Sequence, residues 1–516
     1  MKRLIAVIAA AALLLPTGCA ASEESSGSAS DAAASSAVSE SASSAAEAES
    51  LPDSSAAEPK EDVSSAAEWS PIMQESTPMP SLQKVSEQYE EKKDSITKTL
   101  ESIAKEKEHP CINITTEDGS IIKSKDDYTA AVIDVFNCDD AYKLTAAGGV
   151  KVRGNSTADQ GDEKPYRIKF EEKQGMLGLH GGNAYKSWVL LRSYWNLAPD
   201  YAGLSLAKTI FEGKYYSTDF MYVNLYLNGT PAGIYLLCEQ NQAGKGRIDV
   251  YEPRPDETQN EIGYVIEMDN YASDEHPYFT LDHTGNEFED INGETRKLWD
   301  KDYSIKSDIN TEGQLKFIEK YTDGCFKILY EAAENGKAMK LDESFNTVPA
   351  EDMTPQQAVE AVIDTDSLIN MLILQELVHN NDVGAGSFYM SVDFTDQSIY
   401  KRLTFLAPWD FNWAYEGRSS GKYYACTFQD IWKDGYDRSN IWYTVAMKAD
   451  WFADKVKARW KALHDSGVLT ETTKQIIADC YTLKNDLGEE SWKTDKAKDI
   501  CNFINGRIKW LDKQWL

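Results

Sequence analysis

Closely spaced cysteines are absent from this sequence. It has eight cysteines in 516 residues, all far apart in the chain and none in a CxxC pair. Zinc sites and dense disulfide frameworks need cysteines at short spacings, so the sequence argues against both. One or two disulfide bridges remain open, and the sequence does not assign them. We find no internal repeat.

Positive charge is also scarce, with 53 Lys and Arg against 84 Asp and Glu and a net charge of -31. Residues 20–80 carry 12 acidic residues and one lysine, and the first 19 residues carry two positive charges, which leaves -22 for residues 81–516. This balance disfavours nucleic acid and anionic membranes as partners. It leaves basic proteins, cations or a cation-bridged anion, and a solubilising surface charge is the simplest explanation.

The apolar run at residues 4–15 follows two positive charges and is too short for an ordinary membrane span. This pattern is typical of a secretory signal in residues 1–19. Gly18 before Cys19 resembles the bacterial lipoprotein cleavage box, although Pro16 stands where that box usually has leucine. We expect export and lipidation of Cys19, which would anchor the protein on the outer face of the bacterial cell membrane. Secretion without a lipid is the alternative.

Residues 20–80 are mostly Ser, Ala and Glu, with few large apolar side chains. Such a segment cannot bury enough surface to offset the entropy of ordering the chain, so we expect a disordered tether. Residues 81–110 have apolar side chains at roughly helical spacing and predict a solvated lead-in helix that stops at His109-Pro110.

The remaining residues, 111–516, change from a strand pattern to a helix pattern. Turn signals at Asp118-Gly119, Gly148-Gly149 and Asn228-Gly229 separate short strand-like runs up to about residue 270. We expect strands at 111–114, 121–122, 130–136, 150–153, 166–170, 188–191, 222–227, 233–238 and 263–268. Helices are expected at 204–211, 311–334, 366–379, 440–464 and 470–484, and at the C-terminus. This order predicts an α+β protein with a β-rich lobe at about 111–270, a helix-rich lobe at about 300–516, and a cleft between them.

Two polar clusters follow apolar runs in the second half of the chain. The first is His379-Asn380-Asn381-Asp382, and the second surrounds Asp410 in Pro408-Trp409-Asp410-Phe411. A hairpin of 388–392 with 403–406 lies between them, so both carboxylates should fall at the same end of it. Phosphoryl transfer uses one carboxylate to orient the attacking hydroxyl and another to hold magnesium. Local capping or turn formation by each aspartate is the alternative.

Two candidates for anion binding occur in the β-rich half. Arg153-Gly154-Asn155-Ser156-Thr157 follows a strand and would let backbone amides and a guanidinium approach an anion, although an ordinary turn has the same composition. Arg167 and Lys169 alternate along one strand and therefore share one face. Most such lysines are solvated, and one that faces a cleft could pair with phosphates.

At these residues the chain resembles the CotH family of atypical protein kinases, known from spore coats and related surface proteins. Seven stretches occur in family order between about residues 111 and 460: 153–157, 164–170, 188–191, 225–229, 233–240, 376–382 and 408–411. The resemblance implies a two-lobed protein-kinase-like fold that binds ATP with Mg²⁺ or Mn²⁺ and phosphorylates Ser or Thr of a protein.

Site roles follow from the same resemblance. Asp382 looks like the catalytic aspartate and Asp410 like the metal-binding aspartate. Lys169 looks like the phosphate-binding lysine, and Arg153, Asn155 and Glu239 are further nucleotide-site candidates.

The chain also departs from the family pattern. Tyr201-Ala202 stands where many members have Arg-Asn, and Gly384-Ala385 replaces an aromatic-Arg pair. Asn412 stands where a second aspartate is frequent, and Ser387 lies five positions after Asp382, where ordinary protein kinases place a metal-binding asparagine. These departures remove positive charge and ligand oxygens.

Two functions therefore stay open. One is an active surface kinase that acts on a surface or extracellular protein. The Ser-rich tether could serve it as a substrate in cis, although low-complexity tethers are commonly Ser-rich without that role. The other is a catalytically weak or inactive binding or scaffolding module, which the scarcity of ATP outside cells favours. A hydrolase that uses the two carboxylates is a third and more distant reading. Substrate identity, oligomeric state and a spore or vegetative location cannot be assigned from the sequence.

Overall fold

The structure is a computed structural model. It describes residue 72 and residues 77–154, 158, 163–192, 197–274, 277–281, 287–289, 295–297, 300–415, 424–425 and 440–516. The segments expected to be the signal and most of the tether, Cys19 included, lie outside this range. Among the described residues, no helix has the length and apolar character needed to cross a bilayer.

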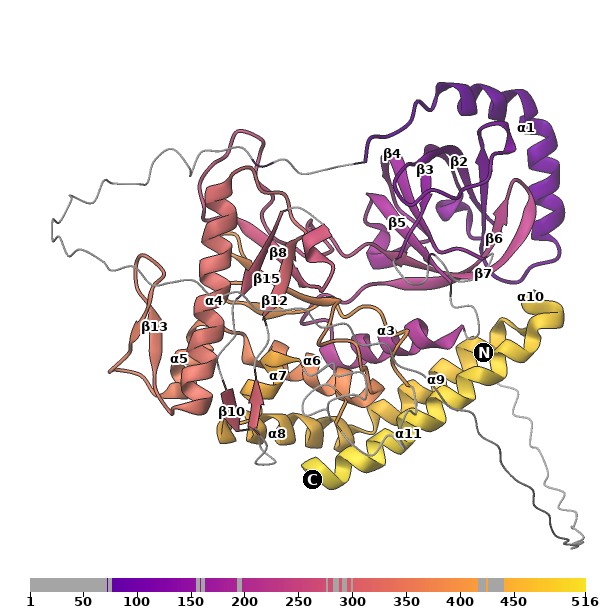
Figure 1. The fold of residues 1–516 in the computed structure, drawn as a ribbon. Coiled ribbons are helices and arrows are strands. Elements are labelled where there is room, and N and C mark those ends of the chain that lie inside the picture. The colour runs from indigo at the N-terminus through magenta and orange to yellow at the C-terminus, as the bar shows by residue number, and fades with distance from the viewer. Residues whose placement is uncertain are drawn as a thin grey trace, which may run out of the picture. The chain divides into compact units, whose positions relative to one another are not determined.

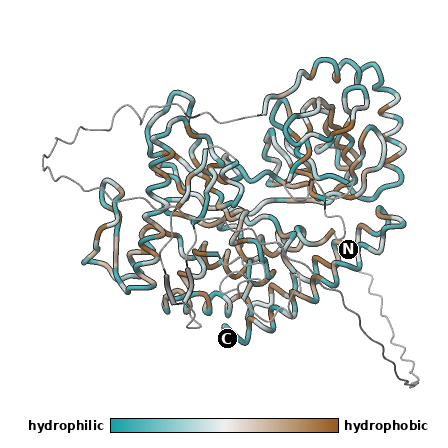
Figure 2. The backbone as a smooth tube through the Cα atoms, viewed as in Figure 1, coloured by the Kyte–Doolittle hydropathy of each residue, from teal (hydrophilic) through white to brown (hydrophobic). Residues whose placement is uncertain are grey.

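The first half of the described chain forms a closed barrel of seven strands, in the order β1-β2-β3-β4-β5-β7-β6 (Figure 1). Within it β1 and β6 pair in parallel, and each other neighbouring pair is antiparallel. Helix α1 (Gln83–Ala104) packs on β2 through Val85 and Tyr89 and is mostly hydrophilic elsewhere (Figure 2). The strands are β1 (Cys111–Thr116), β2 (Thr129–Phe136), β3 (Leu144–Val152), β4 (Tyr166–Gln174), β5 (Tyr185–Leu191), β6 (Phe220–Leu227) and β7 (Thr230–Glu239).

Two of the turn predictions for the barrel are confirmed and one is wrong. Asn228 and Gly229 form the β6-β7 hairpin turn with positive φ angles of 53° and 77°, and Asp118 and Gly119 also have positive φ. Gly148 and Gly149, in contrast, lie inside β3, where a Cβ on Gly149 would come within 2.8 Å of the Tyr128 Cβ. Close packing therefore explains this glycine. The short strand expected at 121–122 is absent.

A five-stranded sheet, ordered β16-β15-β8-β12-β9, two two-stranded sheets, β10-β11 and β13-β14, and a set of helices form the rest of the described chain (Figure 1). Helix and strand contents together confirm the α+β class. The strands are β8 (Gly263–Met268), β9 (Tyr278–Leu281), β10 (Glu287–Glu289), β11 (Thr295–Lys297), β12 (Lys301–Ile305), β13 (Met339–Leu341), β14 (Thr347–Pro349), β15 (Phe388–Asp393) and β16 (Thr404–Phe405). The helices are α3 (Ala198–Phe211), α4 (Glu312–Glu334), α5 (Pro355–Val362), α6 (Thr365–Val378), α7 (Ile441–Ala446), α8 (Asp450–Ser466), α9 (Val468–Thr482), α10 (Lys484–Leu487) and α11 (Asp495–Trp515).

One feature of this region differs from what the sequence predicts. The segment expected as one helix at 440–464 is broken into α7 and α8, because the chain leaves the helical conformation at Ala449. The six described cysteines, at positions 111, 138, 238, 325, 480 and 501, are free thiols, so no disulfide joins any two of them. The barrel and the helices also meet directly, since Asn224 Nδ2 of β6 donates to Asp486 Oδ2 of α10 at 3.0 Å.

Candidate functional site

Asp382 lies in a short turn directly after helix α6. This helix is buried along almost its whole length, and His379 ends it with a left-handed φ of 56°. The carbonyl of Asp382 then accepts from the amides of Ala385 and Gly386 at 2.8 and 3.1 Å. The helix therefore brings the polar cluster to a defined position, as its sequence predicts.

Asn380 joins this turn to Asp410. Its Oδ1 accepts from the Asp382 amide at 3.0 Å, and its Nδ2 donates to the Asp410 carbonyl at 3.3 Å. The hairpin between the two aspartates pairs Met390 with Phe405, as expected. Asp382 and Asp410 consequently lie on neighbouring turns at one end of the hairpin. Sequence reasoning places Asn380 only in a polar cluster, and its closeness to Asp382 in the chain is the signal for its role.

The three carbonyls after Asp382 are all held by donors. Asn440 Nδ2 binds the Val383 carbonyl at 3.0 Å, and Lys301 Nζ binds the Gly384 carbonyl at 2.7 Å. The Asn270 amide binds the Ala385 carbonyl at 2.8 Å. The Gly384-Ala385 departure therefore sits in a tightly held turn, with the buried Lys301 ammonium against it.

Asp410 lies in a second turn, with a left-handed φ of 56°. Phe411 is fully buried, and Asn412 Nδ2 donates to Asp410 Oδ1 at 2.8 Å. Asp200, in the first turn of α3, is buried beside this turn and accepts from the Phe411 amide at 3.1 Å. Burial, and then the charge of Asp410, raises the pKa of Asp200 to about 6. Sequence reasoning missed Asp200, which lies 210 positions before Asp410 and belongs to no recognisable motif.

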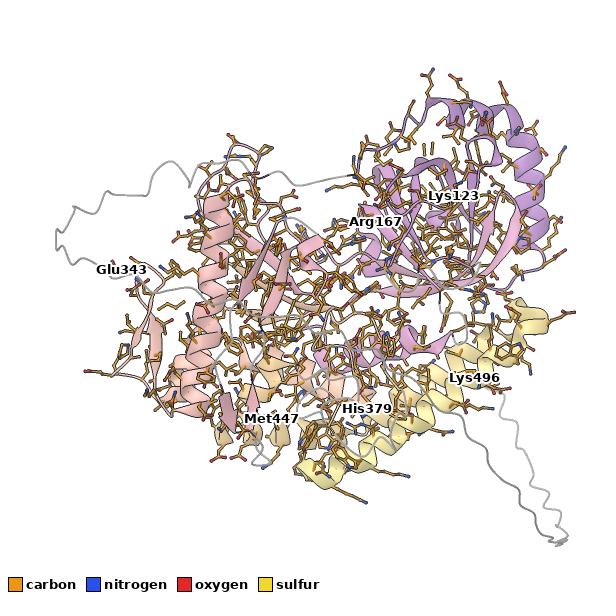
Figure 3. The ribbon with its side chains drawn as sticks, viewed as in Figure 1. Lys123, Arg167, Glu343, His379, Met447 and Lys496 are labelled. Atoms are coloured by element: carbon orange, nitrogen blue, oxygen red, sulfur yellow. The ribbon has the colours of Figure 1, made fainter. Side chains whose placement is uncertain are left out.

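Four cations, which we call the basic row, lie along β3 and β4. Lys151 pairs in register with Arg167. Two residues further along β4, Lys169 pairs with Gly149. Arg153 follows directly after β3, and its guanidinium stands 5.6 Å from the centre of the Trp409 ring. The side chains of both strands alternate between the two faces of the barrel wall. Those that fill the barrel are Val150, Val152, Ile168 and Phe170. Lys151, Arg167 and Lys169 therefore lie on its outer face, as the predicted alternation requires. Arg167 is labelled in Figure 3.

None of these four cations forms an ion pair with a carboxylate in the described part of the chain. Lys151 and Lys169 approach the Tyr128 ring at 5.0 and 5.8 Å, and Lys151 also donates to Thr77 Oγ1 at 3.1 Å. Burial, and then the charge of Arg167, lowers the pKa of Lys169. Unpaired cations in a strongly acidic protein are what an anionic ligand would require. Arg153, at one end of the basic row, stands over the Trp409 ring, and Trp409 directly precedes Asp410.

Glu239 belongs to a separate buried network at the end of β7. Its carboxylate accepts from the Asp219 amide at 2.9 Å and lies 3.5 Å from the Arg247 guanidinium, and His180 bonds to it directly. Arg247 in turn stands 3.9 Å from the centre of the Tyr185 ring. These contacts give Glu239 a structural role, and its role in nucleotide binding stays a prediction. Asn155 lies outside the described residues.

We expect the His180–Glu239 pair to stabilise the protein more at low pH than at high pH. The hydrogen bond and charge of Glu239 raise the pKa of His180 in the folded state. The stabilisation from this pair is therefore fully present below the pKa of histidine in the unfolded chain, about 6.5. It is lost as the pH rises through the higher pKa of His180 in the folded protein. His180→Gln should lower the urea midpoint more at pH 5.5 than at pH 9. The exposed His464→Gln is the control, and an equal loss at both pH values would contradict the assignment.

Tyr201 stands where many family members have arginine, and its side chain points away from Asp410. Its hydroxyl donates to Asp479 of α9 at 2.8 Å, and its ring stacks on Tyr222 at 4.6 Å. An arginine in this conformation would face α9, so its absence removes no cation from the turn that holds Asp410. Ser387 has a φ of 55° immediately before β15.

The described residues contain no group of three His, Cys, Asp or Glu side chains able to hold a metal ion. Mg²⁺ is commonly held by one or two carboxylates together with phosphate oxygens and water. Asp410 with Asp382 nearby, next to a row of unpaired cations, therefore fits a metal bound together with a phosphate ligand.

Comparison with known proteins identifies the family of the chain. The family model described as CotH kinase protein matches residues 150–511, which include the basic row, Asp200, Asp382 and Asp410. A search of curated proteins returned no match. Because the matched segment is more than half of the sequence, the chain belongs to the CotH kinase protein family.

Proposed function

We propose that this protein is a metal-dependent kinase that transfers the γ-phosphoryl group of ATP to Ser or Thr of a surface or extracellular protein. The observation that carries the proposal is the basic row, which lacks carboxylate partners among the described residues and begins beside the turn of Asp410. Phosphates carry the charge that these cations would bind. The barrel and the helical region would then be the two lobes of a protein-kinase-like fold.

The two aspartates would divide the chemistry. Asp382 accepts the proton of the attacking hydroxyl, and Asp410 supplies a ligand oxygen for Mg²⁺ or Mn²⁺. Such an ion neutralises charge on the phosphates when it is bound. Asn380 bonds to the backbone of both turns and so ties the two turns together. Lys169 and Arg153 would hold phosphate oxygens.

The second candidate function is a catalytically weak or inactive binding module. One observation favours it: Asn412 donates its amide to Asp410 Oδ1 at 2.8 Å, and so occupies an oxygen that a metal would use. A metal would have to displace this contact or bind through the other oxygen. The same surface could then serve a protein partner without phosphoryl transfer.

Export supports a place of action outside the cytoplasm, and it rests on the sequence alone. Residues 1–19 have the pattern of a secretory signal, and lipid on Cys19 would attach the protein to the outer face of the membrane. Contact with the membrane would then be through the lipid only.

Nucleotide binding tests the proposal directly. Calorimetric titration of the wild type with ATP should give saturable binding that requires Mg²⁺ or Mn²⁺. Lys169→Glu should weaken binding about 10- to 100-fold, because it removes one charge-assisted contact and adds repulsion. Lys173→Glu, exposed on the same strand, is the matched control. No binding by the wild type with either metal would contradict the kinase, and equal binding by Lys169→Glu would remove Lys169 from the site.

A further inference from the structure

The N-terminal half of α3 contacts the segment 407–415, which contains Asp410, at three points. Asp200 Oδ1 accepts from the Phe411 amide at 3.1 Å, and the Pro199 carbonyl accepts from the Tyr415 hydroxyl at 3.1 Å. Gly203 lies directly against the Phe411 ring, since a Cβ there would come within 2.3 Å of the ring. The helix and the turn therefore pack without room for adjustment.

The segment 407–415 contains three residues other than glycine with positive φ: Ala407 at 52°, Asp410 at 56° and Tyr415 at 61°. Such conformations persist only where surrounding contacts enforce them. Ala407 and Tyr415 each donate their own amide, to the carbonyls of Tyr216 and Val378, both at 2.9 Å. At Asp410 the corresponding hydrogen bond comes from the next residue, Phe411, whose amide donates to the Asp200 carboxylate.

Asp200 is an unfavourable residue for this position unless it has a specific role. It is 8% exposed, and it lies near enough to Asp410 for the two carboxylates to repel each other. Burial of a carboxylate beside another one costs free energy unless a specific contact compensates it. The hydrogen bond from the Phe411 amide compensates part of this cost, and the charge of Arg153 compensates a smaller part.

We propose that Asp200 is a positioning residue for Asp410: its carboxylate oxygen holds the Phe411 amide and thereby keeps Asp410 in the left-handed conformation that metal binding requires. This inference rests on the proposed function in one respect, the metal-binding role of Asp410. Asp200 acts here as a hydrogen-bond acceptor. The hold on the Phe411 amide therefore depends on the shape and the oxygen of its side chain and not on its charge.

Two measurements on three variants test this inference. Hydrogen exchange is followed in the peptide that contains Phe411, and Mn²⁺ binding in the presence of ATP is followed by electron paramagnetic resonance. Asp200→Ala should exchange about tenfold faster at Phe411 and bind Mn²⁺ about tenfold more weakly, the factor for one lost hydrogen bond. Asp200→Asn keeps the acceptor oxygen and should remain within about threefold of the wild type in both. Tyr201→Phe, which removes a bond to α9 from the same helix, should leave both unchanged.

The outcomes separate the inference from the proposed function. Wild-type exchange and wild-type Mn²⁺ affinity in Asp200→Ala would overturn the positioning role. Equal impairment of Asp200→Asn and Asp200→Ala would also overturn it, because the charge, as in direct metal ligation, would then be what matters. If Asp200→Ala does not fold, the retained or lost Mn²⁺ binding of Asp200→Asn decides the question. Failure of the wild type to bind Mn²⁺ with ATP would count against the proposed function, and the exchange measurement would still decide whether Asp200 holds the turn.

Discussion

Asp410→Ala is expected to abolish metal-dependent phosphoryl transfer, with a fall in rate of at least about 10³-fold. The substitution removes the carboxylate that would hold the metal against the phosphates, and no described group of three His, Cys, Asp or Glu side chains could hold the metal instead. Transfer would be measured with labelled ATP and an acceptor protein, at saturating Mg²⁺ or Mn²⁺. Asp382→Asn provides the contrast: it should lower the rate about 10²- to 10⁴-fold and leave nucleotide binding intact, because a general base acts in the reaction and not in binding.

The matched control for Asp410→Ala is Asp396→Ala. Asp396 is exposed and lies in the loop that joins β15 to β16, at the opposite end of the same hairpin. This variant should transfer phosphate like the wild type. Undiminished transfer by Asp410→Ala would refute the metal-binding role of Asp410, whereas absence of transfer in the wild type would favour the inactive binding module.

Arg507→Met is expected to lower the free energy of unfolding by about 3–5 kcal/mol. Arg507 is 1% exposed on α11 and donates to the Glu376 carbonyl from Nε at 3.0 Å and from Nη2 at 2.7 Å. It also lies 3.2 Å from the Glu376 carboxylate, which is fully buried. Removal of the guanidinium would take away this buried counter-charge and both donors to the Glu376 carbonyl. Chemical unfolding of both proteins measures the loss.

Two further variants make this second prediction specific. Lys509→Met changes an exposed lysine on the same helix and should have a stability close to that of the wild type. Glu376→Gln with Arg507→Met removes both charges and keeps an acceptor for the Ala425 amide, which bonds Glu376 at 2.7 Å. The double variant should recover part of the lost stability. A double variant less stable than Arg507→Met would show that the guanidinium acts through packing.

The Arg507 contact also has a bearing on the candidate site. Glu376 is in the last turn of α6, three residues before His379, and His379 packs edge-on against Phe503 of α11 at 5.8 Å (Figure 3). Helix α11 therefore supports the end of α6 from which the Asp382 turn begins. Loss of this support should lower metal-dependent transfer as well as stability.

Local patterns predicted the elements well where apolar residues marked the buried positions. Alternation placed Arg167 and Lys169 on one face of β4, and the apolar spacing of α6 placed the polar cluster after the helix end. Glycine predicted turns less well, because glycine occurs both in turns and where two segments pack closely. Residue type alone does not distinguish Asn228-Gly229 in a hairpin from Gly148-Gly149 inside β3, where contact with the Tyr128 side chain decides.

The sequence by itself determined the α+β order, the family, the pair Asp382 and Asp410, and the shared face of Arg167 and Lys169. The element order, the shared face and the place of the two aspartates follow from local patterns, whose spacing sets relative position. The family follows from the resemblance of seven motifs, and the family model confirms it. Only the tertiary structure revealed the closed barrel, the basic row beside Trp409, and the contacts of Asp200 and Arg507 with segments 211 and 131 positions away. Packing of distant segments creates such contacts, and no local pattern of residue types specifies which distant partner a buried charge will find.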